Sequence, residues 1–179
     1  MGDPSYPLLR TFRFQVKLLK SLELEAGLDR ADDAPLGTVN ETSPDRLAAD
    51  GAFQECTGLD VDLDVQELAE GGRNDGVIRR VGRAKYQNLV LKRGMFHNED
   101  RVDAELWDWV QGVASGSRPI TRYDGLVEVM SVDENVVARW AFERGLPVKI
   151  TGPQLNAKTG EVAIEELHIA HEGLQLVSF

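Results

Sequence analysis

Alternating apolar and polar residues predict half-buried strands in this chain. One run, residues 12–18, places four apolar side chains on a single face: Phe12, Phe14, Val16 and Leu18. A second run, residues 59–65, alternates apolar residues with three aspartates: Asp60, Asp62 and Asp64. A period of two is typical of a strand that buries one face. We therefore expect a second half-buried strand whose outer face carries only carboxylates.

A basic segment follows this acidic strand. Glycines and polar residues at 71–76 form a turn cluster, and four cations come next: Arg79, Arg80, Arg83 and Lys85. Turn residues between two patterned runs indicate a change of chain direction. An acidic strand face and a basic arm are thus adjacent in the sequence.

Further apolar runs predict a mainly β chain. Strands are expected at 89–91, 126–132, 136–142 with an extension bent near Gly145 to 150, 161–169 and 174–179. Residues 133–135 have the composition of a hairpin turn. In 161–169, Val162 and Ile164 fall out of phase with Leu167 and Ile169, so we expect a bulge near Glu165 and Glu166. Many strands joined mostly by short turns predict an antiparallel β-sandwich or barrel.

Only residues 102–113 show a clear helical spacing of apolar residues. Asn98 or Asp100 offers an N-cap, and Gly116 stands where a C-cap glycine is usual. Trp107 and Trp109 cannot both face inward on one helix. We therefore expect one helix packed on the sheets, with one tryptophan at its flank or against a partner.

Length and charge limit the remaining possibilities. At 179 residues the chain is expected to be one domain, 1–179, with an inserted surface loop at 21–50, where apolar periodicity is lost. A net charge of −10 argues against a duplex nucleic-acid binder. The polar start lacks a signal peptide, and no apolar run reaches the ~18 residues of a spanning helix. We expect synthesis in the cytoplasm and no membrane insertion by the chain itself.

The sequence offers little to support catalysis or metal binding. The usual phosphate-loop, dinucleotide, serine-elbow and zincin motifs do not occur. His168 and His171 point to opposite faces of a strand, and the three aspartates lack the glycine and glutamate of a calcium loop. Cys56 has no disulfide partner and fits a small apolar strand residue better than a nucleophile. We expect no enzyme activity, catalytic residue, cofactor or metal.

Several short stretches, taken together, resemble one known family. They lie at 6–7, 12–16, 57–61, 70–72, 91–94, 106–109, 147–153, 161–167 and 170–174. In this order and spacing they resemble the inner tube protein of contractile phage tails and of phage-tail-like contractile injection systems. The resemblance covers nearly the whole chain except Ser21 to Asp50, where the family has a short connection.

The resemblance implies a structural role in an assembled particle. It implies a homo-hexameric ring whose neighbouring sheets complete one large β-barrel, and rings that stack into a tube for protein translocation. The implied partners are a sheath protein, a baseplate or tube-initiator protein, a spike, and tape-measure or cargo proteins. The particle would be a virion component or would be released from the cell, and no sequence-specific nucleic-acid binding is implied.

Two groups of residues receive expected roles from this resemblance. A hairpin arm at 66–85 would reach a neighbouring subunit, with interface candidates Glu70, Gly71, Gly72, Arg73, Arg79, Arg80, Arg83 and Lys85. Basic side chains of one copy would then meet an acidic face of another. The lumen-facing candidates are Asp60, Asp62 and Asp64, whose repeated charge would keep acidic cargo from adhering.

Three interpretations of the function follow. The first is a structural tube protomer, and the 21–50 insertion is compatible with the main tube and with a specialised initiator or terminal ring. A tube-like protein of type VI secretion would share the ring architecture. A monomeric acidic β-sandwich binding module is the third interpretation, and it predicts a pocket and no self-assembly.

Overall fold

The computed structural model describes residues 9, 13–21, 53–69, 71–72, 76–97, 101–158 and 160–177. Within these ranges the chain forms nine strands and one helix, and every strand pairing is antiparallel. The predicted fold class, mainly β with one packed helix, is confirmed. Apart from Ser21, the expected loop at 21–50 lies outside the described residues, so the domain division stays a prediction.

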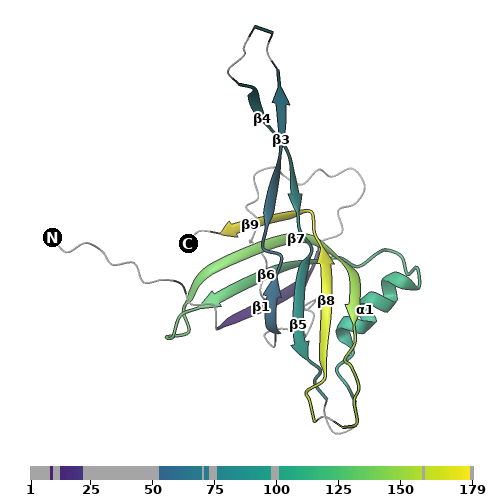
Figure 1. The fold of residues 1–179 in the computed structure, drawn as a ribbon. Coiled ribbons are helices and arrows are strands. Elements are labelled where there is room, and N and C mark those ends of the chain that lie inside the picture. Colours follow the sequence, from purple (N-terminus) through teal and green to yellow (C-terminus); the bar gives the residue numbers. More distant parts are fainter. Residues whose placement is uncertain are drawn as a thin grey trace, which may run out of the picture.

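The first sheet contains four strands in the order β1-β6-β7-β9. These strands are β1 (Phe14–Lys20), β6 (Tyr123–Met130), β7 (Val136–Thr151) and β9 (Gly173–Val177). The predicted hairpin turn at 133–135 joins β6 to β7, with Glu134 at φ 64°. Figure 1 shows β1, β6, β7 and β9 lying side by side.

The second sheet contains β2 (Phe53–Thr57), β5 (Leu89–Gly94), β8 (Ile164–Ala170) and the last third of β7. β7 therefore belongs to both sheets and turns from one to the other near Arg144, at φ 52°. A Cβ at Gly145 would lie 2.7 Å from the carbonyl oxygen of Tyr123, so only glycine fits this crossing. The bend expected near Gly145 is confirmed.

The core lies between the two sheets and is closed on one side by α1 (Glu105–Ala114) (Figure 1). The first sheet contributes Val16, Leu18, Val127 and Phe142, the second Leu89, Leu91, Leu167 and Ile169, and α1 contributes Leu106 and Trp109. Trp109 is 6% exposed, whereas Trp107 lies at the flank of the helix. The expectation that only one of the two tryptophans enters the core is confirmed.

The ends of α1 differ partly from the prediction. Val102 is exposed and forms an isolated β-bridge with His97, and the helix begins only at Glu105, without a side-chain N-cap. Asn98 and Asp100 lie outside the described residues. Gly116 adopts φ 81° and its N–H donates to the carbonyl of Val113, as expected of a terminating glycine. In the described part of the chain no helix has the length and apolar character needed to span a membrane.

The expected bulge in residues 161–169 is wrong. β5 and β8 pair without a register shift, Leu167 and Ile169 are fully buried, and Val162 and Ile164 are exposed. Glu165 takes the buried position in phase with Leu167. The apolar pattern failed here because a buried carboxylate occupies a core position, which hydrophobic periodicity cannot show.

Candidate functional site

The segment that the sequence singles out forms a two-stranded ribbon that extends away from the body of the molecule (Figure 1). β3 (Val61–Leu68) pairs with β4 (Ile78–Tyr86) from Val61 opposite Tyr86 to Leu68 opposite Ile78. Gly58, at φ 89°, bends the chain from β2 toward this ribbon. The arm is therefore longer than the predicted 66–85, because it includes the acidic strand itself.

A bulge interrupts the ribbon near its middle. Leu63 pairs with Ala84 and Val65 with Val81, so Gly82 and Arg83 together face Asp64. A Cβ at Gly82 would lie 3.0 Å from Cβ and from the carbonyl oxygen of Asp64, which explains the glycine. Bulges increase the local twist of a strand pair.

The two faces of the ribbon differ in polarity. Directly opposed residues share a face, so one face carries the apolar set Val61, Leu63, Val65, Val81, Ala84 and Tyr86, with the ion pair of Glu67 and Arg79 toward the tip. The other face carries Asp62, Asp64, Gln66, Arg80, Arg83 and Lys85, with Leu68 opposite Ile78 toward the tip. The alternation of apolar residues and aspartates at 59–65 thus appears in the structure, but within a ribbon of only two strands.

The apolar face of the ribbon is exposed in the single chain. Val61, Leu63, Val65 and Val81 are 49%, 56%, 60% and 74% exposed. The expectation that residues 59–65 form a half-buried strand is therefore wrong for the isolated chain. Periodicity shows that one face is apolar, but it does not show what covers that face. A contiguous exposed apolar patch of this kind is typical of an interaction surface.

The charged face pairs largely with itself. Lys85 Nζ lies 2.7 Å from Asp64 Oδ1, and this hydrogen bond raises the pKa of Lys85. Gln87 donates to Asp62 Oδ2 at 3.3 Å, and Asp60 is exposed just before β3. Asp62 and Asp64 therefore stand beside basic and amide groups of the same chain. They do not form an unopposed acidic face.

The remaining interface candidates lie on β4 or in the segment that connects β3 to β4. Gly71 and Gly72 are in the turn at the tip, with Gly72 at φ 88°. Glu70 and Arg73 lie outside the described residues. Arg79 pairs with Glu67 of β3 at 3.1 Å. The structure thus brings the described candidates onto one ribbon, and their role at an interface stays a prediction.

Open sheet edges form a second candidate surface, whose position the sequence pattern does not predict. Among the described strands, β1 pairs only with β6 and β9 only with β7, so each presents an unpaired edge. Unpaired N–H and C=O groups on such an edge are a template for pairing with another chain. Because the four strands alternate in direction, β9 of one copy would run antiparallel to β1 of a second.

The sheet face directed away from the core carries a buried carboxylate. Glu128 Oε2 accepts hydrogen bonds from Gln15 at 2.7 Å and lies 3.0 Å from Lys17 Nζ, while Arg139 Nε donates to Oε1 at 2.6 Å. Burial alone would raise the pKa of Glu128, but the hydrogen bonds from Lys17, Gln15 and Arg139 outweigh it and hold that pKa below its usual value. Glu128 is therefore ionised at neutral pH.

Another polar cluster, which the sequence pattern did not predict either, joins the second sheet to α1. Arg93 Nε lies 2.6 Å from Glu165 Oε1, and its Nη1 lies 3.0 Å from Asp103. Trp107 Nε1 donates to Glu165 Oε2 at 2.9 Å. The strand expected at 89–91 continues to Gly94 as β5 and so includes Arg93. The phase conflict in 161–169 was the sequence signal that pointed to Glu165.

The base of the ribbon rests on aromatic contacts. The rings of Tyr86 and His171 are 5.5 Å apart, and those of Phe142 and His171 are 5.7 Å apart. Burial lowers the pKa of His171, which keeps it neutral at physiological pH. His168 instead contacts Glu166 at 2.6 Å, so the two histidines do not converge. In the described residues no group of His, Cys, Asp and Glu could hold a metal.

Cys56 lies against the hydrophobic core, half-buried on β2. Burial raises the pKa of its thiol to about 12. The thiol is therefore protonated at neutral pH and a poor nucleophile. This agrees with the interpretation of Cys56 as a small apolar residue.

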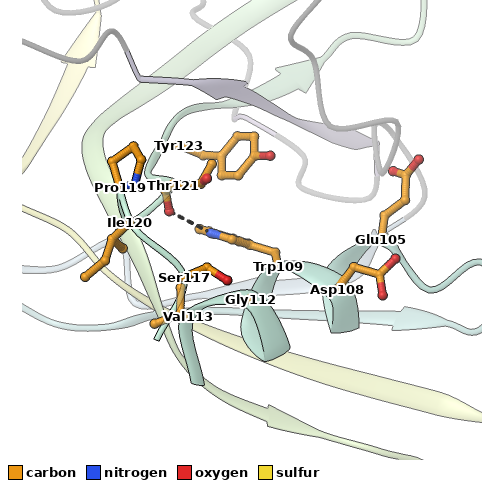
Figure 2. A pocket seen from close by; sticks show the side chains of 10 residues that line it. All are labelled: Glu105, Asp108, Trp109, Gly112, Val113, Ser117, Pro119, Ile120, Thr121 and Tyr123. Carbon is orange, nitrogen blue, oxygen red and sulfur yellow. Dashed lines mark hydrogen bonds between the residues drawn. The ribbon is translucent and has the colours of Figure 1, made fainter. Parts of the chain in front are cut away.

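A pocket of about 310 Å³ lies beside α1 (Figure 2). It is lined by Glu105, Asp108, Trp109, Gly112, Val113, Ser117, Pro119, Ile120, Thr121 and Tyr123, and is called the α1 pocket below. Trp109 Nε1 donates to the carbonyl of Thr121 at 2.9 Å across it. The pocket combines an apolar wall with two carboxylates.

A projecting ribbon with an exposed apolar face and open sheet edges are typical of a subunit that assembles with other chains. The family model of the T4-like virus tail tube protein gp19 matches residues 10–175. The chain therefore belongs to this tail tube family, whose members are structural tube proteins, and the resemblance found in the sequence is confirmed. No curated protein matches the chain.

Solved structures with the same fold come from contractile particles. A chain from the baseplate of the anti-feeding prophage is 20% identical, with a TM-score of 0.68 over 99% of this chain and 97% of that one. A chain from the sheath–tube complex of the extracellular contractile injection system PVC is 17% identical, with a TM-score of 0.70 over 98% and 95%. A chain from the anti-feeding prophage cap is 17% identical, with a TM-score of 0.71 over 100% and 96%. At these identities the likeness concerns the fold.

Proposed function

We propose that this chain is a protomer of the inner tube of a contractile phage tail or contractile injection particle, and that it forms homo-hexameric rings that stack around a lumen. The observation that carries the proposal is the four-stranded sheet β1-β6-β7-β9, whose two outer edges pair with no described strand. Joining β9 of one copy to β1 of the next satisfies both edges and keeps the barrel antiparallel throughout.

The ribbon supplies the second contact. A two-stranded ribbon is marginally stable alone and gains order when it packs against another surface. Covering Val61, Leu63, Val65 and Val81 with a neighbouring copy removes the exposed apolar face from water. Gly71 and Gly72 would lie at the tip of this contact. Glu70 and Arg73, which flank them in the sequence, stay interface candidates.

The first sheet would also supply the wall of the lumen. If the open edges join, the face of β1-β6-β7-β9 that points away from the core lines the lumen, with Gln15, Lys17, Glu128 and Arg139 on it. Asp60, Asp62 and Asp64 remain lumen-facing candidates of the proposal, although the contact between Asp64 and Lys85 weakens their net charge.

The partners are those of a tube in a contractile particle: sheath, baseplate or initiator, spike, and tape-measure or cargo proteins. Likeness to chains from a baseplate and a cap as well as from a sheath–tube complex suits the main tube and a specialised initiator or terminal ring equally. Likeness to a type six secretion system protein is weaker, with a TM-score of 0.51 and 10% identity. Type VI secretion is therefore the second candidate.

Negative-stain microscopy of the purified chain tests this proposal. Hexagonal rings or tubes support it, and a monomer that persists at millimolar concentration contradicts it. The same images test the third interpretation, a monomeric binding module, which predicts particles of single-chain size only.

A further inference from the structure

We propose that the α1 pocket of one copy receives the basic side chains Arg80 and Arg83 from the ribbon of a second copy. This inference rests on the proposed function, since it concerns how protomers meet. It goes further by assigning the surface that receives the ribbon and the chemistry of the contact, an arginine bound between carboxylates and an aromatic wall.

The pocket has the shape and charge for such a guest. Figure 2 shows Glu105 and Asp108 at one side of the α1 pocket and Pro119 and Ile120 at the other, with Trp109 between them. An arginine packs its aliphatic stem on apolar surface while its guanidinium binds carboxylates. The volume of about 310 Å³ is at the lower end for ligand pockets and suits one or two side chains.

One atom of the pocket lacks a partner. Glu105 Oε2 is buried and accepts no hydrogen bond in the described structure. Glu105 and Asp108 stand in the first turn of α1, where carboxylates favour the positive end of the helix. That role explains their presence. Asp108 is exposed, so a donor from outside the chain reaches its carboxylate directly, whereas the buried Glu105 Oε2 must first turn toward the pocket.

The ribbon carries cations that are free to donate. Arg79 is engaged by Glu67 and Lys85 by Asp64. Arg80 and Arg83 are exposed and have no ion-pair partner among the described residues. By register both lie on the charged face of the ribbon, Arg80 opposite Gln66 and Arg83 at the bulge. Asp62 and Asp64 lie on this same face, so the contact proposed here places them against the second copy and not toward the lumen.

The arrangement of the fold favours a contact between copies over one within the chain. The ribbon extends away from the body, whereas α1 lies against the side of the body (Figure 1). A contact between two different surfaces of identical chains is heterologous and propagates into rings or stacks. This is the symmetry that a tube requires.

Charge reversal and charge exchange test the contact. Arg80→Glu with Arg83→Glu is expected to raise the protein concentration for half-assembly at least about tenfold, as measured by sedimentation velocity, because each ribbon then repels the pocket. Glu105→Arg with Asp108→Arg is expected to do the same, and combining all four changes is expected to restore assembly. Because reversed charges at a helix N-terminus weaken folding, Glu105→Gln with Asp108→Asn serves as a milder second variant.

Lys158→Glu, an exposed cation in a loop, is the matched control and is expected to assemble like the wild type. Restoration by the fourfold variant supports the inference. Wild-type assembly that neither reversal changes overturns it while the proposed function stands. Wild-type protein that stays monomeric overturns both.

Discussion

Arg93 and Glu165 form a buried ion pair across β5 and β8, with Nε 2.6 Å from Oε1 and side chains only 2% and 1% exposed. The pair also holds Asp103 and the indole N–H of Trp107, so two strands and the start of α1 meet at one point. Breaking such a pair leaves an uncompensated buried charge. The pair therefore fixes α1, and with it the α1 pocket, on the second sheet.

Removing one member of this pair is expected to be costly. Arg93→Met should lower the free energy of unfolding by about 3–5 kcal/mol, because Glu165 remains buried without its partner. Urea unfolding followed by tryptophan fluorescence measures the change.

The double variant Arg93→Met with Glu165→Leu is the control for this effect. It removes both charges and restores apolar continuity with Leu167, so its loss should be smaller than that of Arg93→Met alone. Single and double variants that lose the same stability would show that the buried charge is not the cause.

The stability of the fold should depend on pH through Glu128. Its pKa is lowered in the folded protein from an ordinary value of 4.5, so its contribution is present above that pH and is lost as the pH falls through the folded value. The difference in the free energy of unfolding between wild type and Glu128→Gln should therefore shrink from pH 6 to pH 3. The exposed change Glu161→Gln is expected to leave the pH profile unaltered. A difference that stays constant with pH would exclude an ionised role for Glu128.

The apolar face of the ribbon should drive association without stabilising the monomer. Val65→Ser with Val81→Ser removes two side chains that are 60% and 74% exposed, so the folded chain loses little. Assembly should weaken strongly in sedimentation velocity, while circular dichroism and thermal unfolding of the monomer change little. Leu155→Ser, at 88% exposure outside the ribbon, is the control and should assemble normally. Equal assembly of all three proteins would remove the ribbon from the contact.

The open edges can be tested by cysteine pairs. Gln15 on β1 and Val177 on β9 lie in one row across the first sheet, through Glu128 and Arg139. Three strand spacings separate them, about 14 Å, which is too far for a disulfide within one chain. Gln15→Cys with Val177→Cys should therefore give a ladder of linked oligomers on oxidation.

Each single cysteine variant is the control for this ladder and should give dimers at most, since the thiol of Cys56 is protonated and half-buried. The single chain does not fix the register between β9 of one copy and β1 of the next. The experiment is therefore repeated with Gln15→Cys and Gln175→Cys. A ladder from neither pair under conditions of assembly would mean that the sheets do not join at β1 and β9.

Much of the fold could be predicted from the sequence because its strands bury one face locally. The runs around Val16, Leu126 and Phe142 gave the correct strands, and Gly116 and Gly145 marked the correct turns. The phase conflict in 161–169 marked the segment that contains Glu165, but the buried ion pair itself could not be predicted because it depends on Arg93, 72 residues away.

The assembly surface was predictable only in part. The alternation at 59–65 correctly showed one apolar face, yet Leu63 and Val65 are exposed because none of the described elements covers them. The pairing of Asp64 with Lys85 depends on the ribbon register and on the bulge at Gly82, which spacing alone does not give. The open edges of β1 and β9 follow from topology and are invisible in sequence.

Cryo-microscopy of the particles formed by the purified chain is the decisive measurement for the proposed tube. We expect hexameric rings in which β9 of each copy pairs antiparallel with β1 of the next and the ribbon lies on a neighbouring copy. Single chains at every concentration, or rings whose β1 and β9 edges stay unpaired, would contradict it.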